Sequence, residues 1–143
     1  MTTTACLIDT AVLLYAVGGD HPLRTGSRRI VEAAGAGDLE LHASVEMVQE
    51  FVFHRMRRGD RMSAVRQARD VAGLCILHDF DRTTLQTALD LIADSRTLGG
   101  RDAVHAATAV QQGLSVIISP DSAFDGIPGL RRIDPNTPID QIG

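Results

Sequence analysis

The chain has 143 residues, enough for one domain with a single core, and its 44% hydrophobic and 22% charged residues exclude an intrinsically disordered protein. The net charge of -4 argues against a protein that coats nucleic acid, but an acidic nuclease site would itself supply about that much negative charge. All 14 basic residues are arginines, which suit bidentate phosphate contacts; codon bias in a GC-rich genome explains this equally well.

No apolar run is long enough to span a membrane, and the chain does not open with a signal-peptide pattern, so a cytoplasmic location is expected. The two cysteines, Cys6 and Cys75, both lie in apolar, strand-like runs. We interpret them as small buried residues rather than as a disulfide or a metal-binding pair.

Strand and helix patterns alternate along the first part of the chain. The patterns predict a strand over 5–9, helices over 10–17 and 22–34, a strand over 39–43 and a helix over 44–58. Pro22 suits the first position of its helix, and Ser44 is a credible N-cap.

The alternation continues to the end of the chain. We expect helices over 63–72, 83–97 and 101–112, strands over 75–77 and 116–119, and an edge strand over 131–133. Asp81 can cap the helix over 83–97, whose inward face would carry Leu85, Ala88, Leu89 and Ile92. Alternating elements of this kind predict an α/β fold with a mostly parallel sheet, in one domain over 1–143 whose tail from about 135 is loosely held.

Four acidic residues occupy comparable places in this pattern. Asp9 ends the first strand, Asp121 follows the strand over 116–119, Glu50 lies within an amphipathic helix, and Asp102 opens a helix. Ligands of an open parallel sheet bind beyond the carboxyl ends of its strands, where these residues could meet. Like charges at close range resist ionisation, so the set predicts a site for a divalent metal ion.

Carboxylates that hold Mg²⁺ or Mn²⁺ can support phosphodiester hydrolysis without a covalent nucleophile. Each acid alone has another explanation: Asp9 and Asp102 could simply cap helices, Glu50 could be a solvated helix residue, and Asp121 could belong to an ordinary turn. The combination carries the hypothesis.

Four segments together resemble the motifs of PIN-domain nucleases, and most closely the VapC-type toxins of bacterial toxin–antitoxin pairs. They are LIDTAVLLYA at 7–16, VQEFV at 48–52, RDAVHAA at 101–107 and ISPDSAFD at 118–125. The resemblance implies a three-layer α/β/α domain with a mostly parallel five-stranded sheet. It also implies a Mg²⁺- or Mn²⁺-dependent endoribonuclease that acts as the toxin of a type II toxin–antitoxin pair and inhibits translation and growth.

Carried over residue by residue, the resemblance implies the catalytic carboxylates Asp9, Glu50, Asp102 and Asp121, of which Asp9, Asp102 and Asp121 bind the metal. It implies a cognate VapB-type antitoxin as partner, and a homodimer or a toxin–antitoxin hetero-oligomer.

Ser119 stands where the family often has a threonine or serine whose hydroxyl holds a water or a phosphate oxygen. Pro120, at a position where the family commonly has another residue, restricts Ser119 to extended geometry, so the aim of Asp121 stays open and Asp125 is the substitute candidate. Thr10 either orients Asp9 or caps the following helix, and capping is favoured. His105 either contacts the substrate or packs in the core, and packing is favoured.

The densest basic stretch runs from Arg55 to Arg69 and either guides RNA phosphates or forms a solvated face. The candidate RNA contacts are Arg55, Arg57, Arg58, Arg61 and Arg101. With no stripe of aromatic residues for base stacking, RNA preference would depend on shape and loop contacts. The apolar segment 47–53 is attributed to core packing, with a dimer interface or antitoxin groove as the alternative.

Two other functions compete with the nuclease. A phosphatase that forms a phospho-aspartate would show an Asp-X-Asp signature after the first strand, whereas here Thr10 and Ala11 follow Asp9. A non-catalytic interaction module could use the acidic cleft to bind metal or a basic peptide.

Overall fold

The computed structural model describes residues 3–143. Strands and helices alternate along this part of the chain, as the sequence predicts. In chain order the elements are β1 (Thr4–Ile8), α1 (Thr10–Val17), α2 (Arg24–Gly35), β2 (Leu39–Ser44), α3 (Val45–Arg58), α4 (Arg61–Leu74), β3 (Ile76–His78), α5 (Arg82–Ala93), α6 (Gly100–Gln111), β4 (Val116–Ile118), the 3-10 helix η1 (Ser122–Phe124), β5 (Arg131–Ile133) and the 3-10 helix η2 (Ile139–Gln141).

The five strands form one parallel sheet in the order β3-β2-β1-β4-β5. At its centre Leu7 of β1 lies beside His42 of β2 and Ile117 of β4. The chain first moves outward from β1 through β2 to β3, and then returns to place β4 on the other side of β1. This reversal leaves a crevice at the carboxyl ends of β1 and β4, where open α/β sheets bind ligands.

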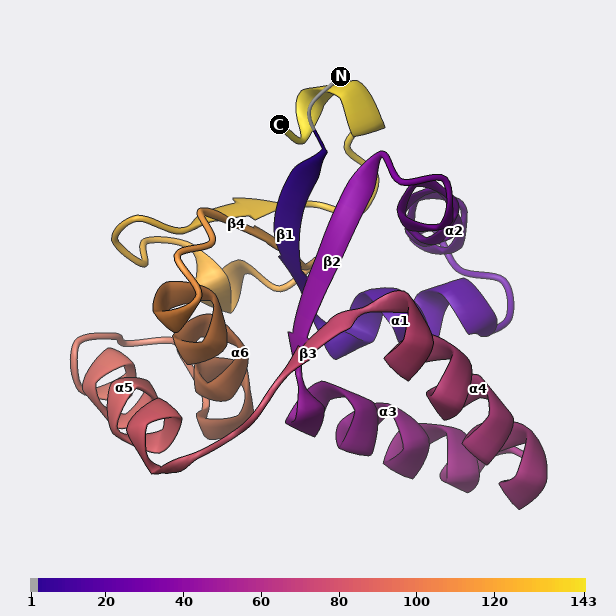
Figure 1. The fold of residues 1–143 in the computed structure, drawn as a ribbon, viewed down its shortest axis with the longest axis horizontal. Helices are drawn as coiled ribbons and strands as arrows, with labels where there is room; N and C mark the ends of the chain where they lie inside the picture. The colour runs from indigo at the N-terminus through magenta and orange to yellow at the C-terminus, as the bar shows by residue number, and fades with distance from the viewer. Residues whose placement is uncertain (1–2) are drawn as a thin grey trace.

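Helices cover both faces of the sheet (Figure 1). Helices α5 and α6 lie on one face, α1, α2 and α4 lie on the other, and α3 crosses below the carboxyl end of β2. The three-layer α/β/α fold with a five-stranded parallel sheet is therefore confirmed. None of the helices within residues 3–143 has the length and apolar character needed to cross a membrane.

The core is aliphatic because the chain has few aromatic residues. Two phenylalanines, Phe51 of α3 and Phe124 of η1, are its largest fully buried side chains. Met47 is also fully buried, whereas Phe53 is 41% exposed, so most of the apolar segment 47–53 is accounted for by core packing. Both cysteines are free and buried, as predicted.

Local capping signals placed some helix boundaries correctly. The hydroxyl of Ser44 accepts a hydrogen bond from the backbone N–H of Glu46, and a carboxylate oxygen of Asp81 accepts one from the N–H of Thr84. The helix predicted from Pro22 instead begins at Arg24. The helix predicted to reach Thr97 ends at Ala93. Beyond it the chain turns, and the Ser95 hydroxyl accepts hydrogen bonds from the backbone N–H groups of Thr97 and Leu98.

The predicted inward face of α5 is wrong at two positions. Leu85 is 44% exposed and Leu89 is 55% exposed, whereas Thr84 and Ala88 are buried. Small side chains let α5 approach α6 closely, and the Thr84 hydroxyl donates a hydrogen bond to Gln111 of that helix. Helix α5 therefore packs on α6 through a narrow stripe of small side chains. One of them is a threonine, which a search for hydrophobic residues at helical spacing does not identify.

The C-terminal segment packs against the domain, where the sequence predicted loose attachment. Ile142 is fully buried, and its carbonyl accepts a hydrogen bond from the guanidinium of Arg131. The segment also lies against α2 at Gly26, whose position leaves no room for a side chain next to Asn136. Burial of one isoleucine and close backbone packing hold this end of the chain in place.

Candidate functional site

A cavity of about 420 Å³ opens at the carboxyl ends of β1 and β4. Segments far apart in the sequence surround it: the start of α1, the middle of α3, the first turn of α6 and the turn after β4. The residues that line it are Asp9, Thr10, Ala11, Leu14, Tyr15, Glu50, His54, Asp102, Pro120 and Asp121. The four acids singled out in the sequence thus border one cavity.

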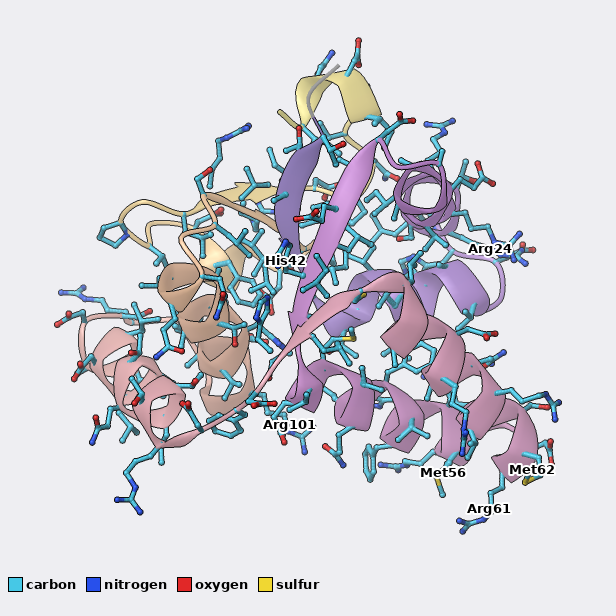
Figure 2. The ribbon with its side chains drawn as sticks, viewed as in Figure 1. Arg24, His42, Met56, Arg61, Met62 and Arg101 are labelled. Carbon is cyan, nitrogen blue, oxygen red and sulfur yellow. The ribbon has the colours of Figure 1, made fainter. Side chains whose placement is uncertain are left out.

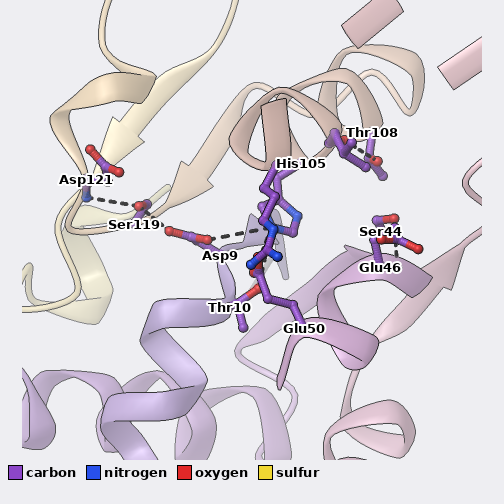
Figure 3. A network of polar contacts seen from close by, with 11 residues as sticks. Asp9, Thr10, Ser44, Glu46, Glu50, His105, Thr108, Ser119 and Asp121 are labelled. Carbon is purple, nitrogen blue, oxygen red and sulfur yellow. Dashed lines mark hydrogen bonds and ion pairs between the residues drawn. The ribbon is translucent and has the colours of Figure 1, made fainter. Parts of the chain in front are cut away.

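Asp9 is held between the two central strand ends (Figure 3). It stands at the N-cap position of α1, but its side chain makes no capping hydrogen bond. Instead, its Oδ2 accepts a 2.7 Å hydrogen bond from the Ser119 hydroxyl, whose oxygen accepts a 3.0 Å bond from the backbone N–H of Asp121. Asp9 and Ser119 are both buried, so the Asp9 carboxylate has a fixed orientation.

His105 connects this carboxylate to α3. Its Nε2 lies 3.5 Å from Oε1 of Glu50, 3.9 Å from Oδ1 of Asp9 and 3.4 Å from the Thr10 hydroxyl. The ring is buried, yet it faces the carboxylates, which the interpretation as a packing histidine does not account for. The Thr10 hydroxyl likewise turns towards His105, a contact that the favoured capping role does not include.

Asp102 shows most clearly that the carboxylates are crowded. Partial burial, together with the negative charges of Asp9 and Asp121, raises the pKa of Asp102 to about 6. Burial also raises the pKa of Asp9, against the opposing effects of His105 and the Ser119 hydrogen bond. The site therefore holds more negative charge than its own residues neutralise.

Glu50 differs from the other carboxylates because His105 compensates its negative charge. The hydrogen bond from His105 lowers the pKa of Glu50 to about 2. Burial lowers the pKa of His105, but the bond to Glu50 and the charge of Asp9 outweigh burial and raise the pKa above its ordinary value. Glu50 is therefore an ionised partner of His105, and the surplus charge lies on the side of Asp102 and Asp121.

Asp121, rather than Asp125, borders the cavity. Asp125 is exposed and forms a 2.8 Å ion pair with the Nε of Arg132. Asp121 places one carboxylate oxygen on the N–H of Ala123 while remaining close enough to Asp102 to raise its pKa. Because Asp121 itself lines the cavity, Pro120 does not turn it away from the site.

The predicted RNA-contacting arginines occupy different places (Figure 2). Arg101 is exposed beside the site, with its Nη1 3.7 Å from Oε2 of Glu50. Arg55 donates a hydrogen bond to Gln67 of α4, Arg57 lies over the ring of Phe53, and Arg61 stands at the outer end of the α3–α4 hairpin. Of these four, Arg101 has the direct contact with a carboxylate of the cavity.

Sequence reasoning missed two residues with polar side chains that line the cavity, Tyr15 and His54. His54 lies four residues after Glu50, so both share one face of α3, and this spacing could have identified it. Tyr15 likewise follows Ala11 by four residues on α1. The missing knowledge was which face of each helix points towards the acids.

The residues present fit a hard divalent cation. Asp9, Glu50 and His105 can each bring one ligand atom within 4.8 Å of the others. Mg²⁺ and Mn²⁺ prefer oxygen, so His105 is better suited to orienting Glu50 and Asp9 than to ligation. A cation next to Asp9, Asp102 and Asp121 would relieve the repulsion that raises the pKa of Asp102.

Comparison with known proteins agrees with this geometry. The family model described as "PIN domain" matches residues 6–130. Ribonuclease VapC7 of Mycobacterium tuberculosis is 33% identical over 132 residues, 91% of each chain. Ribonuclease VapC13 of the same organism is 30% identical over 129 residues, 89% of this chain and 98% of that protein.

Solved structures share the fold at lower sequence identity. A toxin–antitoxin complex from Klebsiella pneumoniae has a TM-score of 0.70 at 19% identity and covers 91% of this chain and 97% of its own. M. tuberculosis VapC20, described as a sarcin–ricin loop cleaving toxin, has a TM-score of 0.65 at 17% identity over 85% of this chain and 90% of its own. By the match over residues 6–130 and its identity with these relatives, the chain belongs to the PIN-domain family and, within it, to the VapC ribonucleases.

Proposed function

We propose that this protein is a Mg²⁺- or Mn²⁺-dependent endoribonuclease that hydrolyses RNA phosphodiester bonds. One observation carries the proposal: Asp9, Glu50, Asp102 and Asp121, from four separate segments, border one cavity at the point where the strand order reverses. The names of the relatives, which are ribonucleases, support the same activity. A crowded set of carboxylates in one cavity suits the binding of a divalent cation.

The metal would be held by Asp9, Asp102 and Asp121. When bound, such a cation polarises the phosphate and makes a water molecule a better nucleophile. The Ser119 hydroxyl keeps Asp9 in one orientation by donating to its Oδ2.

His105 and Glu50 act as a pair on the other side of the cavity. His105 places Nε2 3.5 Å from Glu50 and 3.9 Å from Asp9, so a proton on this nitrogen would orient Glu50 and offset part of the negative charge presented to the RNA. Arg101, exposed at the rim next to Glu50, is available to contact a phosphate oxygen of the incoming strand. These residues thus position the substrate and the carboxylates, with no covalent step on the protein.

The proposal is tested by incubating purified protein with structured RNA in the presence of Mn²⁺, Mg²⁺ or EDTA. The wild type should cleave only with a divalent ion, and Asp9→Asn or Asp102→Asn should abolish cleavage and growth inhibition while circular dichroism shows an intact fold. Asp125→Asn is the matched control, because Asp125 pairs with Arg132 outside the cavity and should be dispensable.

Cleavage at the wild-type rate by Asp9→Asn or Asp102→Asn with Mg²⁺ would show the mechanism to be wrong. If the wild type cleaves no RNA with any divalent ion, the acidic cavity would instead belong to an interaction module that binds metal or a basic peptide. If the wild type does cleave RNA, mapping its cleavage sites on total cellular RNA would identify the substrate.

We also propose that the protein is the toxin of a type II pair, neutralised by a small VapB-type antitoxin in the cytoplasm. Several similar solved structures are complexes of this kind, from Rickettsia felis and Salmonella typhimurium among others. Co-expression with the product of a small open reading frame just upstream should restore growth, and the two proteins should co-purify. Unchanged toxicity in the presence of that product would refute the pairing.

A further inference from the structure

A second cavity continues the carboxylate cavity along α1 and α3. It also has a volume of about 420 Å³, and it shares Leu14, Tyr15 and His54 with the carboxylate cavity. The other residues that line it come from the end of α1 with the following loop and from the last turns of α3: Gly18, Gly19, Asp20, His21, Arg55 and Arg58. We call this second cavity the side groove.

The side groove contains an aromatic surface that the sequence did not reveal. The rings of Tyr15 and His21 are stacked, with centroids 4.2 Å apart and planes inclined by 23°. Tyr15 also borders the carboxylate cavity, so this surface begins where the reacting phosphate would lie. A nucleobase next to that phosphate can extend the stack, since stacking on aromatic rings accepts any base.

The charge of the side groove changes along α3. Glu50 lines the carboxylate cavity, His54 lines both cavities, and Arg58 lines the far end of the side groove. Glu50 and Arg58 are eight residues apart, or ~12 Å along a helix at 1.5 Å per residue. One acidic residue, Asp20, also lines the side groove, but its Oδ1 forms an ion pair with Nη1 of Arg24 at 3.2 Å. A cationic end at this distance suits a backbone phosphate displaced from the cleavage site.

We propose that the side groove binds a single-stranded nucleotide that flanks the scissile phosphate, with its base stacked on Tyr15 and a phosphate held by Arg58. The proposal rests on the ribonuclease function and adds a substrate subsite to it. Single-stranded RNA fits because its unpaired bases are free to stack on side chains. The proposal assigns different roles to Arg58 and Arg61, although they are only three residues apart. Arg58 lines the side groove, whereas Arg61 stands at the outer end of the α3–α4 hairpin and lines neither cavity.

The test is binding of a short fluorescein-labelled single-stranded RNA in EDTA, measured by fluorescence anisotropy so that no cleavage is required. Tyr15→Ala should weaken binding by about tenfold. Arg58→Gln should weaken binding and reduce the slope of log affinity against log salt by about one. The matched control Arg61→Gln should change affinity much less, and Tyr15→Phe, which keeps the ring, should bind like the wild type.

An abasic site beside the mapped cleavage position removes the base from the RNA without changing the wild-type protein. It should weaken binding to the wild type but make no further difference to Tyr15→Ala. If the wild type cleaves RNA while Tyr15→Ala and Arg58→Gln bind like Arg61→Gln, the side groove is not a nucleotide site and the nuclease stands. If the binding contrast is present but no RNA is cleaved, the side groove still binds single-stranded RNA, but the ribonuclease function and the link to a scissile phosphate both fail.

Discussion

Replacing Asp102 by Asn should make the metal-free protein more stable at neutral pH, although it removes a proposed metal ligand. Burial and the charges of Asp9 and Asp121 raise the pKa of Asp102 from 3.8 to about 6. Ionisation of Asp102 is therefore less favourable in the folded than in the unfolded state, and it costs stability. Asparagine keeps the shape of the side chain without the charge.

The size of the gain follows from the pKa. A rise of roughly 2, at 1.36 kcal/mol for each pKa unit, corresponds to ~3 kcal/mol. Asp102 is only half buried, and solvent screening reduces the gain to ~1.5 kcal/mol. Asp102 lies in the first turn of α6, where a negative charge is favourable by ~0.5 kcal/mol. The net gain of ~1 kcal/mol predicts a rise in Tm of about 3 °C.

The assay is thermal unfolding in EDTA, followed by circular dichroism between about pH 4 and pH 8. Because the folded pKa lies above the unfolded one, the cost of the charge grows as the pH rises through this window and is complete above about pH 6. The advantage of Asp102→Asn should therefore be greatest at neutral pH and vanish near pH 4. Mg²⁺ or Mn²⁺ should raise the Tm of the wild type more than that of the variant.

Asp125→Asn is the control with the opposite sign. The hydrogen bond from Arg132 lowers the pKa of Asp125, so its charge favours the fold and its removal should leave the Tm unchanged or slightly reduced. A lower Tm for metal-free Asp102→Asn at pH 7, or a gain that persists at pH 4, would refute the claim that the carboxylates repel one another. A wild-type Tm unaffected by millimolar Mg²⁺ and Mn²⁺ would also count against a site of repelling carboxylates that a cation relieves.

Three further outcomes are expected. Gly26→Ala should destabilise the fold by about 2 kcal/mol, measured by urea unfolding, because the new Cβ would lie 2.5 Å from the backbone carbonyl oxygen of Pro135 and would also clash with Asn136; wild-type stability would mean that the C-terminal segment is not held there. Burial raises the pKa of Cys6 to about 11 and of Cys75 to about 12, so iodoacetamide at pH 8 should label neither thiol until the protein is denatured. Rapid labelling of the native protein, detected by mass spectrometry, would contradict the burial of these thiols. Ser119→Ala should lower kcat for RNA cleavage roughly tenfold with little change in KM, because it removes the hydrogen bond that orients the Asp9 carboxylate. A rise in KM alone would mean that Ser119 contacts the substrate instead.

Local chemistry in the sequence determined much of the fold. The first strand, predicted over 5–9 and observed over Thr4–Ile8, and the helix over 10–17 could be predicted because apolar runs and helical spacing depend on near neighbours. Ser44 and Asp81 cap their helices through N–H groups two or three residues away. The alternation of elements then required a parallel sheet.

Tertiary structure alone decided how the site is built. The choice of Asp121 over Asp125 depends on Arg132, which draws Asp125 away, and the orientation of His105 depends on Glu50 and Asp9. The stacked pair of Tyr15 and His21, which opens the side groove, was equally invisible.

The physical reason is the range of each interaction. Helix propensity and capping act over a few residues and are visible in the sequence as spacing. Burial, pKa and charge pairing join segments such as Asp9 and Ser119, which are 110 residues apart and meet because β1 and β4 are neighbours in the sheet. The sequence determined which acids were available, and the sheet decided which side chains they meet.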